Sequence, residues 1–444
     1  MSIFLYKIKI KKYIYVLFLY ITFICRCYSD QILYDDEVID FFDNLTTPIL
    51  KVSNLEGRGI NVQIILSNTI NAYVIDNKNV YVYSGLISSV DNIEGLIGVI
   101  AHEIAHIKQS HILKFKENIN LEKKKAIFST ILGLAIGISI NKPGVATIGA
   151  LGSAEMAHLD ILRHSRHNEY AADKLALDYL FKLGVQKKEM INFFKKLENR
   201  ERIYNFKNSY RLTHPLTSER IRFIESVNDE VILNNSSKYP NQELINKFDI
   251  IKAKLFAITN SFTDTNKVYD CKEDYCLYAN CIAYSKNKNF EKAIEIIDKL
   301  IKKNPNYIYY YITKAQLLFE SGDVSQSNYY YQMVIKKDPK LYISKYELAN
   351  QLIIKKMNIK TAIELLKEVI FHYSSVPEIW KKLGNAYYIN KDYFEANKHY
   401  FESSIIVGDK KLSEIFLKRS QKYAKTTEQK NQMILLEKKF SEMG

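Results

Sequence analysis

The sequence predicts a predominantly helical α+β protein in two parts, an N-terminal domain with a small antiparallel sheet and a C-terminal all-α repeat solenoid. Its 444 residues exceed the size of one ordinary domain. Runs of β-forming residues between positions 62 and 83 precede a long apolar helix that carries two histidines four residues apart. From about residue 274, small residues, aromatic residues and prolines recur with a 34-residue period, as Pro305 and Pro339 show directly.

The N-terminus has the pattern of a secretory signal. A lysine-rich opening is followed by the apolar run from Tyr13 to Cys25 and then by small or polar residues. This run is short for a membrane span. We therefore expect residues 1–29 to be a signal peptide, cleaved after Ser29, and the mature chain to lie outside the cytoplasm. An uncleaved membrane anchor is the alternative.

The charge balance gives little support to a nucleic-acid partner. The formal net charge is +14, but the first 29 residues contain five cations and no acid, so that +9 remains without them. The other basic residues are spread among acids, mostly along predicted helices, which is typical of solvated faces. We expect no nucleic-acid binding.

Three cysteines, Cys271, Cys276 and Cys281, would remain after cleavage. Their spacing of five matches neither a helical face nor the paired C-x-x-C of zinc ribbons, which disfavours a metal site built from cysteines. A disulfide between Cys271 and Cys276 requires Cys271 to precede the helix that holds the other two. Cys276 and Cys281 on one helix are poorly placed for a bridge.

A small sheet is expected after a short helix near residues 37–45. The segments 62–66, 72–76 and 80–83 alternate or cluster β-formers, and Asn77, Lys78 and Asn79 supply the turn between the last two. We expect an antiparallel sheet. An exposed edge strand of such a sheet can hold an extended peptide by backbone hydrogen bonds.

The stretch 91–116 should form the next helix, with Asp91 and Glu94 at capping-box spacing. His102 and His106 are four residues apart and project from one face, so both imidazoles can bind one metal ion. Glu103 follows the first ligand, where its carboxylate can take a proton from metal-bound water. This H-E-x-x-H pattern also arises by chance, so the rest of the chain has to support it.

Residues 126–157 contain two uncharged runs separated by Asn141, Lys142, Pro143 and Gly144. Neither run is long enough to cross a bilayer comfortably as a helix. We expect a helical hairpin that packs on the domain or touches a membrane surface peripherally. Insertion into the membrane is the alternative.

A further helix, opening near Ser165 and ending near Gly184, supplies the ligand that the two histidines lack. Glu169 and Asp173 are four residues apart and share a face. Glu169 can complete a three-ligand zinc site and leave the fourth position open. Asp173 is suited to accept the second imidazole N–H of a ligand histidine and so fix its tautomer.

Together these motifs resemble those of the gluzincin metallopeptidases, which include the CAAX prenyl endopeptidases, the membrane heat-shock proteases and the periplasmic β-barrel assembly-enhancing proteases. The matching motifs span about residues 60–225 and are Asn71-Ala72-Tyr73, Gly85-Leu86, Ala101-His102-Glu103-Ile104-Ala105-His106, Ser165-Arg166-x-Asn168-Glu169-x-x-Ala172-Asp173 and Thr213-His214-Pro215 with Arg220. Two features depart from the family pattern. Members often carry an acid at the position of Ala171, and the turn at residues 77–79 replaces a Gly-rich one. Both departures concern the shape of the cleft.

The resemblance implies a zincin-like protease domain over residues 30–230 with one Zn²⁺ per chain. His102, His106 and Glu169 would bind the ion, Glu103 would be the general base, and Asp173 would support a ligand. Asn71 and Ala72 would lie on the strand that binds substrate.

Two further residues have roles implied by the resemblance. His214 corresponds to a histidine that, in the repeat-bearing periplasmic branch, can plug the fourth zinc position and hold the enzyme latent. Its alternative is a helix entrance with no regulatory role. Arg220 would help to polarise the scissile carbonyl, with a surface salt bridge as the alternative.

The C-terminal part, residues 271–444, has tetratricopeptide (TPR) spacing. The clearest unit has Trp380, Leu383, Gly384 and Tyr387 followed by Ala396 and Tyr400. We expect four repeats at 274–307, 308–341, 342–376 and 377–410, then a capping helix from Leu412. A polar linker and a helix over 244–260 would join the two parts within residues 231–270.

The resulting prediction is a periplasmic zinc endopeptidase that hydrolyses misfolded or stalled envelope proteins in outer-membrane protein quality control. The TPR groove would recruit unfolded substrates or the β-barrel assembly machinery of the outer membrane. Two alternatives are a non-proteolytic TPR chaperone or scaffold, and a membrane-embedded protease of the same family.

Overall fold

The computed structural model describes residues 31–74, 76–109, 166–204, 214, 218–228 and 239–443. The expected signal peptide at residues 1–29 and the expected hairpin at residues 126–157 lie outside these ranges. Within the described ranges, none of the helices combines the length and the apolar character that a membrane crossing requires.

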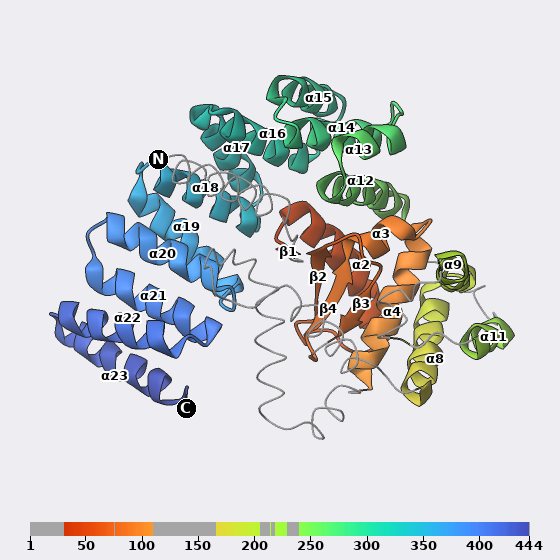
Figure 1. Ribbon diagram of the computed structural model, residues 1–444, viewed down its shortest axis with the longest axis horizontal. Coiled ribbons are helices and arrows are strands. Elements are labelled where there is room, and N and C mark those ends of the chain that lie inside the picture. The colour runs from red at the N-terminus through yellow and green to blue at the C-terminus, as the bar shows by residue number, and fades with distance from the viewer. Residues whose placement is uncertain are drawn as a thin grey trace, which may run out of the picture.

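A four-stranded mixed sheet forms one side of the N-terminal part (Figure 1). Its strands are β1 (Gln31–Leu33), β2 (Asn61–Leu66), β3 (Ala72–Val74) and β4 (Asn79–Tyr83), in the order β1-β2-β4-β3. β1 with β2 and β3 with β4 are antiparallel, whereas β2 and β4 are parallel.

The prediction of an antiparallel sheet is therefore wrong for its central pair. The β3–β4 hairpin joins β2 through β4, its second strand, so the chain must return to the same direction as β2. Strand alternation specifies which residues face the core, but it does not specify strand order. The same order places β3 at an edge of the sheet.

Helices pack on the sheet and on one another to form the core of the N-terminal part. These are α2 (Asp36–Val52), α3 (Ser84–Ser89), α4 (Ile93–Lys108), α8 (Arg166–Leu183), α9 (Lys188–Tyr204) and α11 (Ser218–Ser226). α4 is the central one, because its residues from Leu96 to Ile107 are all buried. It packs against α2, α8, α9 and β3, so a helix in the interior is held on every side.

The first turn of α4 differs from the predicted capping box. Asn92 is the N-cap residue, and its side-chain oxygen accepts a hydrogen bond from Gly95 N at 3.0 Å. Asp91 lies one residue earlier, is exposed and pairs with Lys196 instead. Both Asn and Asp are good N-caps, so the sequence alone did not separate the two positions.

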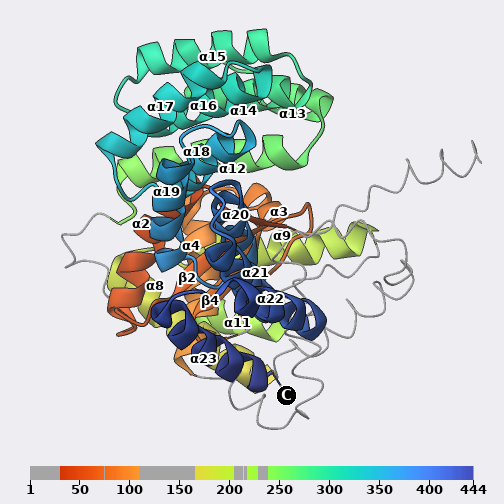
Figure 2. The same cartoon turned by 90° about the vertical axis from the view of Figure 1, so that its left-hand side faces the viewer.

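The C-terminal part is an array of helices that curves around the N-terminal part (Figures 1 and 2). After α12 (Gln242–Thr259) and α13 (Phe262–Val268), helices follow in antiparallel pairs. They are α14 (Asp274–Lys286), α15 (Phe290–Lys303), α16 (Ile308–Ser321), α17 (Val324–Lys337), α18 (Tyr342–Ile354), α19 (Ile359–His372), α20 (Pro377–Ile389), α21 (Tyr393–Val407), α22 (Lys410–Tyr423) and α23 (Thr427–Ser441).

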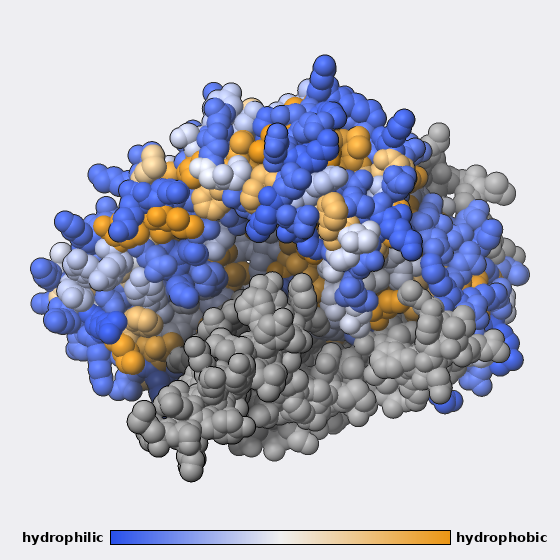
Figure 3. All heavy atoms as spheres, turned by 45° about the horizontal axis from the view of Figure 1, so that its top comes forward, coloured by the Kyte–Doolittle hydropathy of each residue, from blue (hydrophilic) through white to orange (hydrophobic). Residues whose placement is uncertain are grey.

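Small residues let the paired helices approach, as the repeat pattern requires. Ala293, Ala315, Ala349 and Ala396 are fully buried between helices. A Cβ on Gly384 would lie 2.6 Å from the Tyr400 ring, so α20 and α21 meet there at a distance that excludes any larger residue. The array face in Figure 3 is mostly hydrophilic with small, separate apolar patches.

The disulfide is the one that the sequence spacing permits. Cys271 lies before α14 and forms a disulfide with Cys276 on that helix. Cys281 is a buried free thiol whose Sγ donates to the Ala293 carbonyl at 3.3 Å.

Candidate metal centre

Three of the side chains singled out by the sequence lie on one turn of α4. His102, Glu103 and His106 are all 0% exposed. The four-residue spacing places both imidazoles on the same face, with the two Nε2 atoms 3.1 Å apart. The rigid surroundings of α4 hold these rings in the protein interior.

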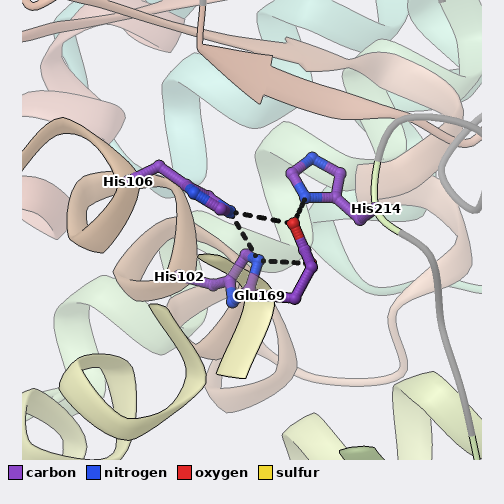
Figure 4. A group of neighbouring side chains, drawn as sticks. All are labelled: His102, His106, Glu169 and His214. Carbon is purple, nitrogen blue, oxygen red and sulfur yellow. Dashed lines mark hydrogen bonds and ion pairs between the residues drawn. The ribbon is translucent and has the colours of Figure 1, made fainter. Parts of the chain in front are cut away.

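Two other elements bring further ligand atoms to the same point. Glu169 on α8 places Oε2 3.4 Å from His102 Nε2 and Oε1 3.3 Å from His106 Nε2. His214 places Nδ1 3.3 Å from Glu169 Oε1. Figure 4 shows the three rings directed at the Glu169 carboxylate. All four side chains are buried, and their ligand atoms lie within 4.8 Å of one another.

The spacing of these atoms fits a tetrahedral metal ion. Ligands about 2.0–2.1 Å from a zinc ion at tetrahedral angles would lie roughly 3.3–3.4 Å from one another. Four separations in the structure, 3.1, 3.3, 3.3 and 3.4 Å, are close to that value; two of them involve Glu169 Oε1 and one involves Oε2. Two imidazoles and a carboxylate are also a ligand set that zinc accepts.

The charge of the site favours a cation as well. Glu103, Glu169 and Asp173 are fully buried, and Arg220, which is 1% exposed, is the cation that pairs with two of them. Three carboxylates face one guanidinium away from water, and their charge is costly unless further cations, protonated histidines or a bound metal ion, balance it. A divalent ion between the ligands would do so.

Asp173 and Arg220 support the ligand residues from behind. His102 Nδ1 lies 3.0 Å from Asp173 Oδ1, a contact that directs Nε2 of the same ring at the other ligands. Arg220 on α11 donates to both Asp173 oxygens, from Nε at 2.7 Å and from Nη2 at 2.8 Å. Its Nη1 lies 2.5 Å from Glu169 Oε2. One guanidinium thus fixes both acids of α8.

Residues 43–228 match the model of the protein family described as Peptidase family M48. This segment contains every residue of the site just described. This part of the chain belongs to peptidase family M48. We call residues 43–228 the M48 domain.

Curated relatives are similar over longer stretches. The beta-barrel assembly-enhancing protease of Yersinia pestis is 21% identical over 371 residues, which cover 81% of this chain and 74% of that protein. A relative from Vibrio cholerae is 24% identical over 295 residues, 64% of this chain and 59% of that protein. The beta-barrel assembly-enhancing protease of Escherichia coli K12 is 24% identical over 194 residues, 44% of this chain and 39% of that protein.

Solved structures similar to the chain include TPR proteins. The C-terminal part of a TPR repeat-containing protein from Cytophaga hutchinsonii is 16% identical, with a TM-score of 0.34, and covers 44% of this chain and 78% of that chain.

The edge strand of the M48 domain lies beside the ligands. β3 pairs with β4 on one side, with Ala72 opposite Val82, and β4 lies between it and the rest of the sheet. The Ala72 carbonyl is 3.1 Å from His214 Nε2. The neighbouring Asn71 carbonyl accepts from Tyr83 N at 3.0 Å, which anchors the start of the strand. The edge therefore begins beside the cluster of His102, His106, Glu169 and His214.

The electrostatics of the M48 domain separate the acids into two kinds. Despite burial, Arg220 and the histidines hold the pKa of Glu169 well below its usual range, and Arg220 with His102 lowers the pKa of Asp173. Burial raises the pKa of Glu103, although His214 and His102 oppose the rise. Glu169 and Asp173 are thus held as anions, while Glu103 more readily exchanges a proton.

The His102 ring responds to the same carboxylates. Burial disfavours its charged form, but contacts with Asp173 and Glu169 outweigh burial and raise the pKa of His102 to about 9. A metal ion would displace this proton on binding, because only a neutral imidazole is a ligand.

Sequence reasoning named all of these residues but missed two of their contacts. It expected Arg220 to polarise a substrate carbonyl, with a surface salt bridge as the alternative; the guanidinium is buried and forms its salt bridges with Asp173 and Glu169. It did not anticipate that His214 reaches the edge strand as well as the ligand cluster. Both contacts join elements distant along the chain, so no local spacing signals them.

Proposed function

We propose that this chain is a zinc-dependent endopeptidase. The supporting observation is the set of ligand atoms at tetrahedral spacing, adjacent to a buried Glu103 and to an edge strand that can hold a peptide. His102, His106 and Glu169 would hold the ion. Zinc would supply Lewis acidity for the peptide carbonyl and an activated water.

The residues of the chain would perform the remaining steps. β3, from Ala72, would align an extended substrate by backbone hydrogen bonds that do not depend on its sequence. Glu103 would take the proton of the attacking water and return it to the leaving amine, a task that suits its raised pKa. Asp173 would keep His102 in its ligating tautomer, and Arg220 would position Asp173 and Glu169.

His214 would hold the site closed in the absence of substrate. Its Nδ1 faces Glu169, and its Nε2 is directed at the Ala72 carbonyl and lies 3.3 Å from Glu103 Oε1. The ring thus occupies the space that a substrate carbonyl and its neighbouring peptide would need. We expect His214→Ala to raise basal proteolysis. Unchanged basal proteolysis would leave His214 with a structural role only.

The proposed biological role draws on the curated relatives and on the N-terminal sequence. Relatives named as beta-barrel assembly-enhancing proteases, together with the signal-like residues 1–29, suggest a periplasmic enzyme that cleaves misfolded or stalled envelope proteins. The array would recruit substrates or the β-barrel assembly machinery, and residues 126–157 would contact a membrane surface. A non-proteolytic TPR chaperone remains the alternative, which the complete ligand set argues against.

One comparison tests the enzyme directly. The mature chain is assayed for bound zinc and for degradation of an unfolded outer-membrane protein, alongside Glu103→Gln and Glu94→Gln. Glu94 makes the same chemical change on the first turn of α4, away from the ligands. We expect Glu103→Gln to retain zinc and lose about 10²- to 10⁴-fold in rate, and Glu94→Gln to retain activity. Absence of zinc, or equal degradation by all three proteins, would contradict the proposal.

A further inference from the structure

The N-terminal turn of α2 caps a helix that belongs to the repeat array. Asp36 Oδ1 accepts from Ile343 N at 3.0 Å, and Oδ2 accepts from Ser344 N at 2.8 Å and Ser344 Oγ at 2.7 Å. Ile343 and Ser344 are the second and third residues of α18, whose N–H groups have no partner within the helix. The N-cap residue of α18 is Leu341, which makes no capping bond with its side chain. The side chain of Asp36, more than 300 residues earlier in the sequence, therefore takes the place of an N-cap side chain from α18 itself.

The next residue contacts an earlier repeat. Glu37 Oε2 accepts from Tyr278 Oη on α14 at 2.9 Å and from Lys254 Nζ on α12 at 2.8 Å. Glu37 Oε1 accepts from Tyr307 Oη, immediately before α16, at 2.7 Å. Glu37 and Lys254 are both buried. Adjacent acids of one turn thus contact three consecutive repeats, at α14, at the residue before α16 and at the start of α18.

The opposite side of α2 packs into the core of the M48 domain. Phe41, Phe42, Leu45 and Ile49 are at most 2% exposed and lie in the core that also contains α4 and α8. α2 packs directly against both of these helices. α4 holds His102 and His106, and α8 holds Glu169. A single helix of 17 residues therefore touches the array at its start and the ligand-bearing helices along its length.

We infer that α2 couples the repeat array to the metal centre, with Asp36 and Glu37 as the residues that dock the array. Because Asp36 caps α18, a shift of the array must either break the cap and weaken the start of α18, or displace α2 together with the array. Packed interiors transmit such a shift rather than absorb it. A partner that changes the curvature of the array would in this way move α2 against α4 and α8.

A second consequence concerns partner binding. The surfaces of α14, α16 and α18 that meet Asp36 and Glu37 are filled by the chain itself. An external partner would have to use other parts of the array, such as α20 to α23. This inference does not depend on the proposed peptidase activity, because it concerns only how the two parts of the protein hold each other.

Amide hydrogen exchange of the full chain tests the coupling. Asp36→Ala is compared with Asp43→Ala, which removes an exposed acid from the same helix. We expect amides at the start of α18 to exchange about 2- to 30-fold faster in Asp36→Ala, the range that corresponds to the loss of a helix cap. If α2 transmits the change, amides of α4 and α8 will also exchange faster. Asp43→Ala should match the wild type throughout.

Two outcomes would overturn the inference. Equal exchange at the start of α18 in both variants would show that Asp36 does not cap this helix. Faster exchange confined to α18, with α4 and α8 unchanged, would show that docking is not coupled to the metal centre. If Asp36→Ala does not fold, Ser344→Ala serves instead, because it removes one of the three donors and leaves both capped N–H groups. The same pattern is expected with Ser344→Ala at smaller amplitude, and the same two results would refute it.

Discussion

Arg220 offers a sharp test of how the metal centre is built. Its guanidinium makes three contacts of 2.5–2.8 Å with Glu169 and Asp173, and all three side chains are at most 1% exposed. Replacing Arg220 by alanine leaves two buried carboxylates without this partner. Breaking a buried ion pair by removing one member costs about 3–5 kcal/mol. For a domain of the size of residues 43–228, this corresponds to a fall in Tm of roughly 6–20 °C.

The assay is thermal unfolding of Arg220→Ala and of Arg222→Ala, an exposed arginine on the same helix. We expect the full decrease in Tm for Arg220→Ala and almost none for Arg222→Ala. Zinc affinity, measured by competition with a chelator, should fall about 10- to 100-fold in Arg220→Ala, because Glu169 and Asp173 lose their orientation. If the two variants melt within about 2 °C of each other and hold zinc equally, the guanidinium does not organise the site.

Three further outcomes can be checked. Stripping metal with a chelator should lower Tm, because an ion that binds only the folded protein stabilises it, and added zinc should restore Tm; an unchanged Tm would contradict the proposed metal centre. Gly98→Ala should lower the free energy of unfolding by about 1–3 kcal/mol, because the new Cβ would lie 2.8 Å from the Met190 Cβ. Gly95→Ala, whose Cβ would have its nearest neighbour 3.6 Å away, should leave the free energy of unfolding unchanged or raise it by about 0.5–1 kcal/mol. Thermal unfolding of both variants measures the difference. Burial raises the pKa of the Cys281 thiol to about 12, so the native protein should have almost no thiolate at pH 8 and resist alkylation until denatured; rapid stoichiometric labelling of the native protein would count against this.

The parts of the protein that follow from local spacing were the most predictable. A helical period of 3.6 residues relates His102 to His106 and Glu169 to Asp173, and each pair does share a face. The 34-residue period likewise depends on neighbouring helices packing on each other, and the array follows it from α14 onward. In both cases the sequence pattern that predicts the contact extends over no more than about one pair of neighbouring helices.

The contacts that local spacing missed all join distant segments. The parallel pairing of β2 with β4 depends on which strand of a hairpin docks, and the capping of α18 by Asp36 depends on how the array folds back. An acid at the start of a helix is ordinarily explained by the dipole of its own helix. The residues around Asp36 do not indicate that its carboxylate oxygens accept hydrogen bonds from the N-terminus of a different helix.

Under the proposed function, His214 would connect substrate binding with access to the metal. Its Nε2 is directed at the Ala72 carbonyl, the first acceptor of the edge strand, while its Nδ1 faces the ligand cluster. A peptide that adds to β3 from its first residue must take over this carbonyl, and in doing so it removes one of the contacts that hold the ring against Glu169. Loss of the ring would free the position where the scissile carbonyl has to lie. On this proposal, a peptide able to form strand hydrogen bonds would open the site by the same step that aligns it, whereas a folded surface without a free backbone edge would leave His214 in place.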